Sequence, residues 1–84
     1  MYNNEKGNLK LINRTLEKYS DDELKGKALM GARIFKQISQ TELSKITGIS
    51  QHHIAELENG KLRIVKKDAK IFAKALDQLE GVFL

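Results

Sequence analysis

The sequence contains no cysteine, no proline and no tryptophan. Without cysteine the chain has no disulfide framework, no thiol nucleophile and no thiolate metal ligand. Thiol-free chains suit the reducing cytoplasm, and we expect a cytoplasmic protein. No apolar run approaches the length of a membrane span, and the polar first residues, MYNNEKGN, do not resemble a secretory signal. We therefore expect no contact with a membrane.

The absence of proline and the abundance of Leu, Lys, Glu, Ala and Gln favour an all-α fold. With 84 residues the chain is long enough for one small domain, which buries ~60–70% of its unfolded surface. We expect this domain to cover residues 23–84, preceded by an N-terminal arm or an additional helix over residues 1–22.

The net charge of +4 lies entirely in residues 23–84, which hold eleven basic and seven acidic side chains. Residues 1–22 hold four of each sign. The cations are densest at Lys61, Arg63, Lys66, Lys67, Lys70 and Lys74, with Asp68 as the one acid among them. Such a run is compatible with a solvated helix face, but we favour contact with the phosphates of a nucleic acid.

The central stretch SQTELSKITGISQHHIAELENG, residues 39–60, predicts two short helices joined by a tight turn. Ser39 and Glu42 form a capping box, which starts a helix from Gln40 to about Ile46. Gly48 supplies the positive φ that a sharp reversal requires. Ser50 caps a second helix from Gln51 to about Glu58, in which Ile54 and Leu57 face inward and the remaining residues face outward.

Three further segments have helical spacing. Leu9, Ile12, Leu16 and Tyr19 form an N-terminal stripe that covers the core, a second copy or another protein, although residues 8–11 alternate as a short strand would. The capping box of Ser20 and Glu23 predicts a helix to about Lys36 that buries, among others, Leu29 and Phe35, with Gly31 marking a close helix crossing. After a linker over 61–64, the residues Val65, Ala69, Phe72, Ala73 and Leu76 predict another core helix. Asp77 breaks or caps it, and a last short helix over 78–84 places Leu79, Val82 and Phe83 in the core.

This arrangement resembles the helix-turn-helix of the phage-repressor and Cro-like (lambda-repressor-like) family of DNA-binding proteins. The matching residues are Gly26, Leu29, Arg33, Ile38, Ser39, Gln40, Leu43, Gly48, Ile49, Ser50, Ile54, Glu58, Asn59 and Gly60. The resemblance covers residues 23–84 and implies five core helices. The chain departs from the family at Gln37, where glycine is usual, and in the linker, where proline is frequent. Gln37 therefore either adopts a left-handed cap or belongs to a differently shaped turn.

The second helix of the pair is expected to enter the major groove by its N-terminal end and to present Gln51, His52 and Glu56 to base edges. Glutamine pairs with adenine N6 and N7, whereas a carboxylate accepts only from cytosine N4 or adenine N6. Glu56 is therefore either a selective reader or a rim residue turned toward a basic neighbour.

Phosphate contacts are expected at both ends of the helix pair. The N-terminus of the Gln40 helix offers free amides and the Gln40 side chain, and the resemblance implies the same role. The other expected phosphate contacts are Ser50, His53, Asn59, Lys61, Arg63, Lys66 and Lys67. By resemblance, Arg33 and Glu58 form a structural ion pair, although Arg33 has the alternative of sharing its guanidinium with a phosphate.

Other chemistries find little support in the sequence. His52 and His53 are neighbours ~100° apart on a helix and cannot chelate one metal ion together. No nucleophile motif and no phosphate-cradling glycine loop is present, so we expect no enzyme activity, no metal and no cofactor.

The expected function is that of a sequence-specific regulator of transcription, in particular a repressor, that binds double-stranded DNA as a homodimer on half-sites ~34 Å apart. Val82, Phe83 and Leu84 or the N-terminal stripe are candidate dimer contacts. The alternative is an antitoxin that binds a toxin protein through residues 9–19 and represses its own operon. A third interpretation is a fold that serves protein contact only.

Overall fold

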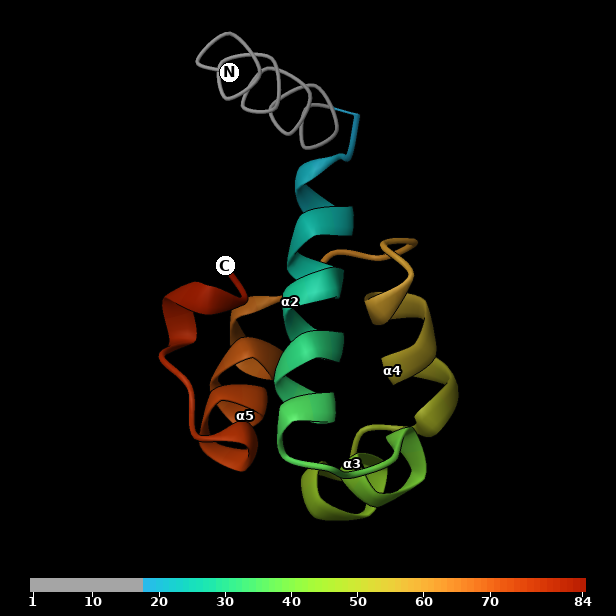
Figure 1. The fold of residues 1–84 in the computed structure, drawn as a ribbon, viewed down its shortest axis with the longest axis vertical. Helices are drawn as coiled ribbons and strands as arrows, with labels where there is room; N and C mark the ends of the chain where they lie inside the picture. The colour runs from blue at the N-terminus through green and yellow to red at the C-terminus, as the bar shows by residue number, and fades with distance from the viewer. Residues whose placement is uncertain (1–17) are drawn as a thin grey trace, which may run out of the picture.

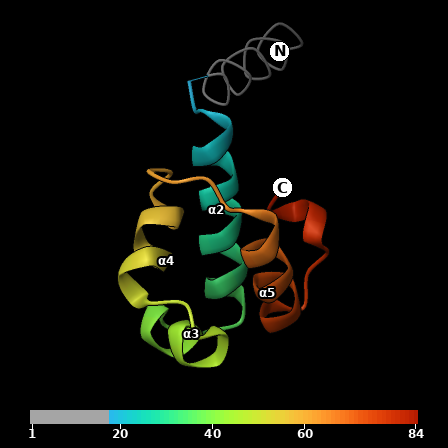
Figure 2. The same ribbon diagram turned by 180° about the vertical axis from the view of Figure 1, so that it is seen from behind.

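The computed structural model describes residues 18–84, and within this range the regular elements are all helices. Its elements are α2 (Asp21–Phe35), α3 (Gln40–Thr47), α4 (Gln51–Glu58), α5 (Lys66–Leu76) and the 3-10 turn η1 (Glu80–Val82). Helix α2 stands in the middle with α4 on one side and α5 on the other, and α3 crosses below it (Figure 1). Seen from behind, the connection from α4 to α5 passes across α2 (Figure 2).

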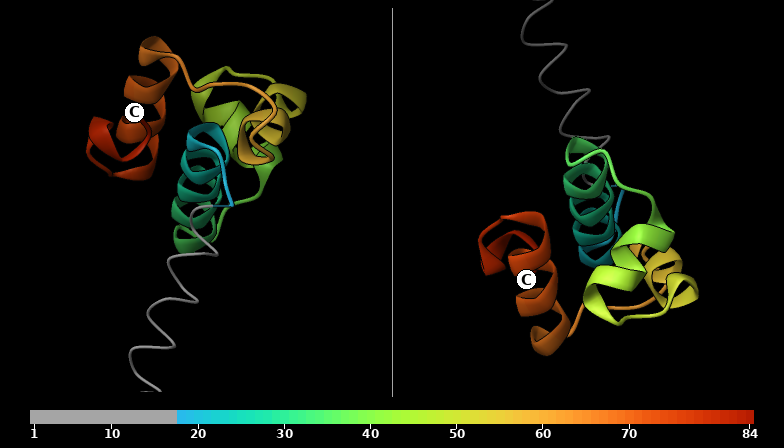
Figure 3. Two further views of the ribbon diagram at one scale, coloured as in Figure 1. Left: turned by 90° about the horizontal axis from the view of Figure 1, so that it is seen from above. Right: turned by 90° about the horizontal axis from the view of Figure 1, so that it is seen from below.

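Viewed along α2, α4 and α5 lie on opposite sides of this helix (Figure 3). Helix α3 contacts both of them. The all-helical prediction is confirmed for the described residues. The expected additional helix and the stripe of Leu9, Ile12 and Leu16 lie outside them. No helix within residues 18–84 is long and apolar enough to cross a lipid bilayer.

Serine side chains start three of the four α-helices, as the sequence predicts. The Ser20 hydroxyl accepts from the Glu23 amide at 3.1 Å while the Glu23 carboxylate accepts from the Ser20 amide at 2.9 Å. The same reciprocal pair joins Ser39 and Glu42 at the start of α3. Ser50 accepts from the His53 amide and so caps α4. These bonds satisfy amides that a helix start otherwise leaves unpaired.

Left-handed residues end or follow all four α-helices, with Gly60 after α4 at φ 74°. Gly48 caps α3 with φ 77°, and Asp77 caps α5 with φ 59°. Gln37 follows α2 with φ 60°, so the first of the two alternatives for this position is correct. A side chain in this conformation costs ~1–2 kcal/mol. The ends of α2 and α5 lie close together, because Lys36 Nζ is 3.6 Å from the carboxylate of Asp77.

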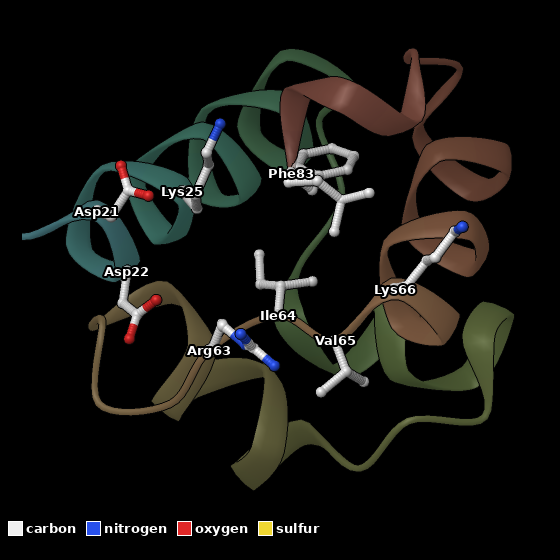
Figure 4. A pocket seen from close by; sticks show the side chains of 9 residues that line it. Asp21, Asp22, Lys25, Arg63, Ile64, Val65, Lys66 and Phe83 are labelled. Carbon is white, nitrogen blue, oxygen red and sulfur yellow. The ribbon is translucent and has the colours of Figure 1, made fainter.

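The core lies between α2, α4 and α5. Its buried residues are Leu29, Leu43, Ile54, Leu57, Ile64, Ala69, Phe72, Ala73, Leu76 and Phe83. The rings of Phe72 and Phe83 meet edge to face with centroids 6.4 Å apart, a favourable aromatic geometry. Ile64 and Phe83 point into a small cavity of about 260 Å³ between the start of α2, the linker and the last residues (Figure 4).

The close helix crossing lies at Gly26, not at Gly31. A Cβ on Gly26 would be 2.3 Å from the carbonyl oxygen of Leu57 in α4, whereas a Cβ on Gly31 would meet no atom within 4 Å. Gly26 therefore allows the backbone of α2 to touch the backbone of α4. This contact sets the distance between α2 and α4.

Several burial predictions are wrong. Phe35 is 79% exposed, because it lies six residues after Leu29 and so ~240° around the helix from the buried face. The expected last helix is the single turn η1, with Leu79 81% exposed and Val82 36% exposed. Val65 is also exposed, and Ile64 from the predicted linker takes a place in the core instead.

Candidate nucleic-acid interface

Helix α4 presents polar side chains on the face opposite to its core contacts. Ile54 and Leu57 are fully buried. Gln51 and His52 are exposed, and the His52 side chain keeps 85% of its accessible surface. The Glu56 side chain is 30% exposed. The three expected base-contacting residues thus share the outward side of one helix, where a groove of duplex DNA has access to them.

A chain of hydrogen bonds holds the first of these residues in place. Gln51 Nε2 donates to Gln40 Oε1 at 2.7 Å, and Gln40 Nε2 donates to Glu58 Oε1 at 2.9 Å. The amide of Gln51 is therefore anchored on α3, and its carbonyl oxygen and second N–H stay available for a partner. The sequence predicts both glutamines as DNA contacts but not the bond between them.

Arg33 of α2 holds the other end of this chain. Its Nε donates to Glu58 Oε2 at 2.7 Å and its Nη2 donates to Glu58 Oε1 at 3.0 Å, while Nη1 donates to the Ile38 carbonyl at 2.9 Å. The side-chain hydrogen bond to Glu58 raises the pKa of Arg33, against the opposing effect of burial. Because Glu58 is 3% exposed, this bidentate contact supplies the charge compensation that a buried carboxylate requires. The guanidinium is thus engaged inside the fold.

The adjacent histidines contact different carboxylates. His52 lies within ion-pair distance of Glu56, one turn on along α4. His53 Nε2 lies 3.5 Å from the carboxylate of Asp68 and so faces the first turn of α5. Among residues 18–84 no group of three or more His, Cys, Asp or Glu side chains is arranged to hold a metal ion.

The expected phosphate contacts surround α4. Gln40 lies at the N-terminus of α3, and Ser50 and His53 lie at the start of α4. Asn59 caps the end of α4, and Lys61, Arg63, Lys66 and Lys67 are exposed along the linker and the start of α5. The structure holds this segment at two points. Gly60 packs against Glu23, where an added Cβ would be 2.5 Å from Cγ, and Ile64 is 3% exposed in the core.

Two short helices joined by a left-handed glycine turn, with the second helix exposed beside a basic segment, define a helix-turn-helix fold. The comparison with protein families agrees. A family model described as Helix-turn-helix, of the Cro/C1 type, matches residues 32–81. The chain belongs to this lambda-repressor-like family, and the resemblance noted in its sequence is confirmed. No curated protein is similar enough to be counted as a match.

Membership in this family makes the chain a DNA-binding regulator of transcription. The family is regulatory and not typically enzymatic. Its expected ligand is double-stranded DNA.

Proposed function

We propose that the chain is a sequence-specific repressor that inserts α4 into the major groove of its operator. The observation that carries this proposal is the anchored Gln51 amide. A side chain already held by Gln40 loses little rotational freedom when it binds, and its free carbonyl and N–H match adenine N6 and N7. Each bidentate contact of this kind discriminates against other bases by ~1–3 kcal/mol.

Glu56 and His52 would read a neighbouring base as a pair. The Glu56 carboxylate accepts from cytosine N4 or adenine N6 and repels a guanine edge, which presents only acceptors. His52 lies one turn before it on α4, close enough to donate a hydrogen bond to this carboxylate. In this proposal, Glu56 is both a selective reader and turned toward a basic neighbour.

The phosphate contacts set the affinity. The N-terminus of α3 with Gln40, the start of α4 with Ser50 and His53, and the segment with Asn59, Lys61, Arg63, Lys66 and Lys67 would hold the two backbones on either side of the groove. His53, which lies beside Asp68 at the start of α5, would contact a phosphate from this position. One recognition helix covers few base pairs, so we propose a homodimer on two half-sites ~34 Å apart. Repression then follows from occupation of the operator.

The direct test is selection of bound sequences from random duplex DNA with the wild-type chain and with Gln51→Ala, at two salt concentrations. We expect a palindromic motif for the wild type and loss of preference at one position per half-site for the variant. Gln78→Ala, which removes an exposed glutamine next to η1, is the matched control and retains the motif. Recovery of the same motif with Gln51→Ala would contradict the assignment of this residue.

An antitoxin role is the second candidate, and the apolar sequence stripe from Leu9 to Tyr19 is the feature that favours it. A stoichiometric protein that copurifies from the native source and is lost on removal of residues 1–17, which leaves the Ser20 cap of α2 in place, would support it. A fold used for protein contact alone would keep every such interaction after Gln51→Ala with His52→Ala and would ignore all duplexes.

A further inference from the structure

A groove outside the proposed DNA surface lies between α3 and α5. Its lining residues are Ile46 of α3 and Ile71, Lys74 and Ala75 of α5, and its volume is about 490 Å³. This volume falls within the ~300–1,000 Å³ of typical ligand pockets. Ile46 is 60% exposed, although it lies on a helix that is otherwise anchored by the fully buried Leu43. The groove thus offers an apolar floor that the described fold does not cover.

One lysine lines this groove, and a second lies beside it on the same face of α5. Lys74 lines it directly, and Lys70 lies one turn earlier on α5. Within residues 18–84 neither lysine has a carboxylate within ion-pair distance. The nearby acids have other partners: Glu42, on the same face of α3 as Ile46, accepts from the Ser39 amide, and Asp77 lies beside Lys36. Lys70 and Lys74 belong to the basic run of the sequence, but the proposed phosphate contacts are confined to its first four members, Lys61, Arg63, Lys66 and Lys67.

We propose that this groove, named here the α3–α5 groove and formed by Ile46, Ile71, Lys74 and Ala75, docks an acidic amphipathic segment of another protein. A large apolar side chain of the partner would lie on Ile46 and Ile71, and its carboxylates would face Lys70 and Lys74. This is the helix-in-groove mode of recognition with charge complementarity at the edge.

Two other occupants fit less well. A second copy of the chain brings a net charge of +4 to an edge that is already basic. A DNA backbone would satisfy the lysines, but it has no apolar group to bury on Ile46 and Ile71. The groove also lies at the C-terminal end of α3, and Ile46 is six residues, or ~9 Å along the helix, from Gln40. The protein partner would therefore occupy the α3–α5 groove, and the operator would occupy the surface around α4 and the N-terminus of α3.

The test is an NMR titration of the full ¹⁵N-labelled chain with a synthetic helical peptide about four turns long, with leucines at helical spacing on one face and glutamates elsewhere. We expect amide shifts at Ile46, Ile71 and Ala75. Ile46→Gln should weaken binding about tenfold, and Lys70→Gln with Lys74→Gln about fivefold. Ile46→Gln should bind duplex DNA as the wild type does.

Three controls make the result decisive. Ile34→Gln replaces an isoleucine of α2 with similar exposure, 57%, and should leave peptide binding unchanged. Lys61→Gln with Lys66→Gln should weaken DNA binding and not peptide binding. A peptide with lysines in place of the glutamates should not bind.

Three outcomes of the titration would overturn the proposal: no binding of the acidic peptide, amide shifts confined to residues 61–67, or an equal loss of peptide binding with Ile34→Gln. Loss of DNA binding on removal of Lys70 and Lys74 would assign the groove to nucleic acid and would overturn it as well.

Discussion

The two glycines of α2, Gly26 and Gly31, differ in the space available for a side chain: Gly26 lies against the backbone of α4, whereas Gly31 faces open space. Gly26→Ala would drive a Cβ to 2.3 Å from the Leu57 carbonyl oxygen, so the backbones of α2 and α4 would have to separate. We expect a loss of about 2 kcal/mol or more in the free energy of unfolding. Gly31→Ala meets open space in a helix and should add about 0.5–1 kcal/mol. Urea unfolding of both variants measures the difference, and equal effects would show that the crossing is not set by Gly26.

The Arg33–Glu58 pair provides a second prediction for single residues. Arg33→Ala leaves a carboxylate that is 3% exposed with Gln40 as its remaining side-chain donor, which should cost about 3 kcal/mol of stability. Replacing both partners, with Arg33→Met and Glu58→Leu, removes the buried charge and should recover most of this loss. Thermal unfolding of the single and double variants tests the claim. A double variant no more stable than Arg33→Ala would contradict it.

At the scale of the helices, the two capping boxes predict a pH dependence. The backbone amides of Ser20 and Ser39, followed by their hydroxyls, lower the pKa values of Glu23 and Glu42 from the ordinary 4.5. Below pH 4.5 the unfolded chain therefore binds more protons than the folded chain. The stabilisation is fully present above that pH and is lost as the pH falls through the lowered pKa values.

Replacement of both carboxylates, with Glu23→Gln and Glu42→Gln, should therefore flatten the decline of stability in acid. Urea midpoints at neutral pH and on either side of pH 4.5 measure this change. Glu80→Gln removes a carboxylate from η1 and is the matched control, which should keep the wild-type decline. An unchanged decline in the double variant would show that the capping boxes are not its source.

The starts of the helices follow from the sequence because capping is local. Ser20, Ser39 and Ser50 accept hydrogen bonds from backbone amides three residues further along the chain. Such a short-range contact can be recognised from the residue types at the two positions alone. Burial of Ile64 depends on which elements meet in space, and the local pattern is ambiguous at this position. Exposure of Phe35 follows instead from its angle of ~240° to Leu29 around the helix, so the helical spacing already disfavoured its burial. The bond between Gln40 and Gln51 joins residues eleven positions apart and needs the angle between α3 and α4. The turn at Gln37 departs from the expected glycine, so the sequence leaves its conformation open.

At the scale of the whole molecule, charge should govern affinity. Under the proposed function, Lys61 and Arg63 each neutralise one phosphate, so Lys61→Gln with Arg63→Gln should reduce the slope of log affinity against log salt by about 1.8. The selected sequence should stay the same, because phosphate contacts carry no base information. Fluorescence anisotropy with a selected duplex over a salt series measures the slope. Lys25→Gln with Lys27→Gln, on α2, should leave the slope unchanged, and an equal reduction there would indicate a diffuse effect of net charge.

The connection from α4 to α5 has an unusual constraint for a surface loop. Gly60 is fixed against Glu23 at one end, and Ile64 is fixed in the core at the other. Most exposed loops accept insertions and deletions readily. Here, one residue more or fewer would either pull Ile64 out of the core or displace the neighbouring cations by ~3.5 Å, about the rise from one phosphate to the next on a DNA strand. Homologous chains should therefore vary in composition across this loop while they keep its number of residues.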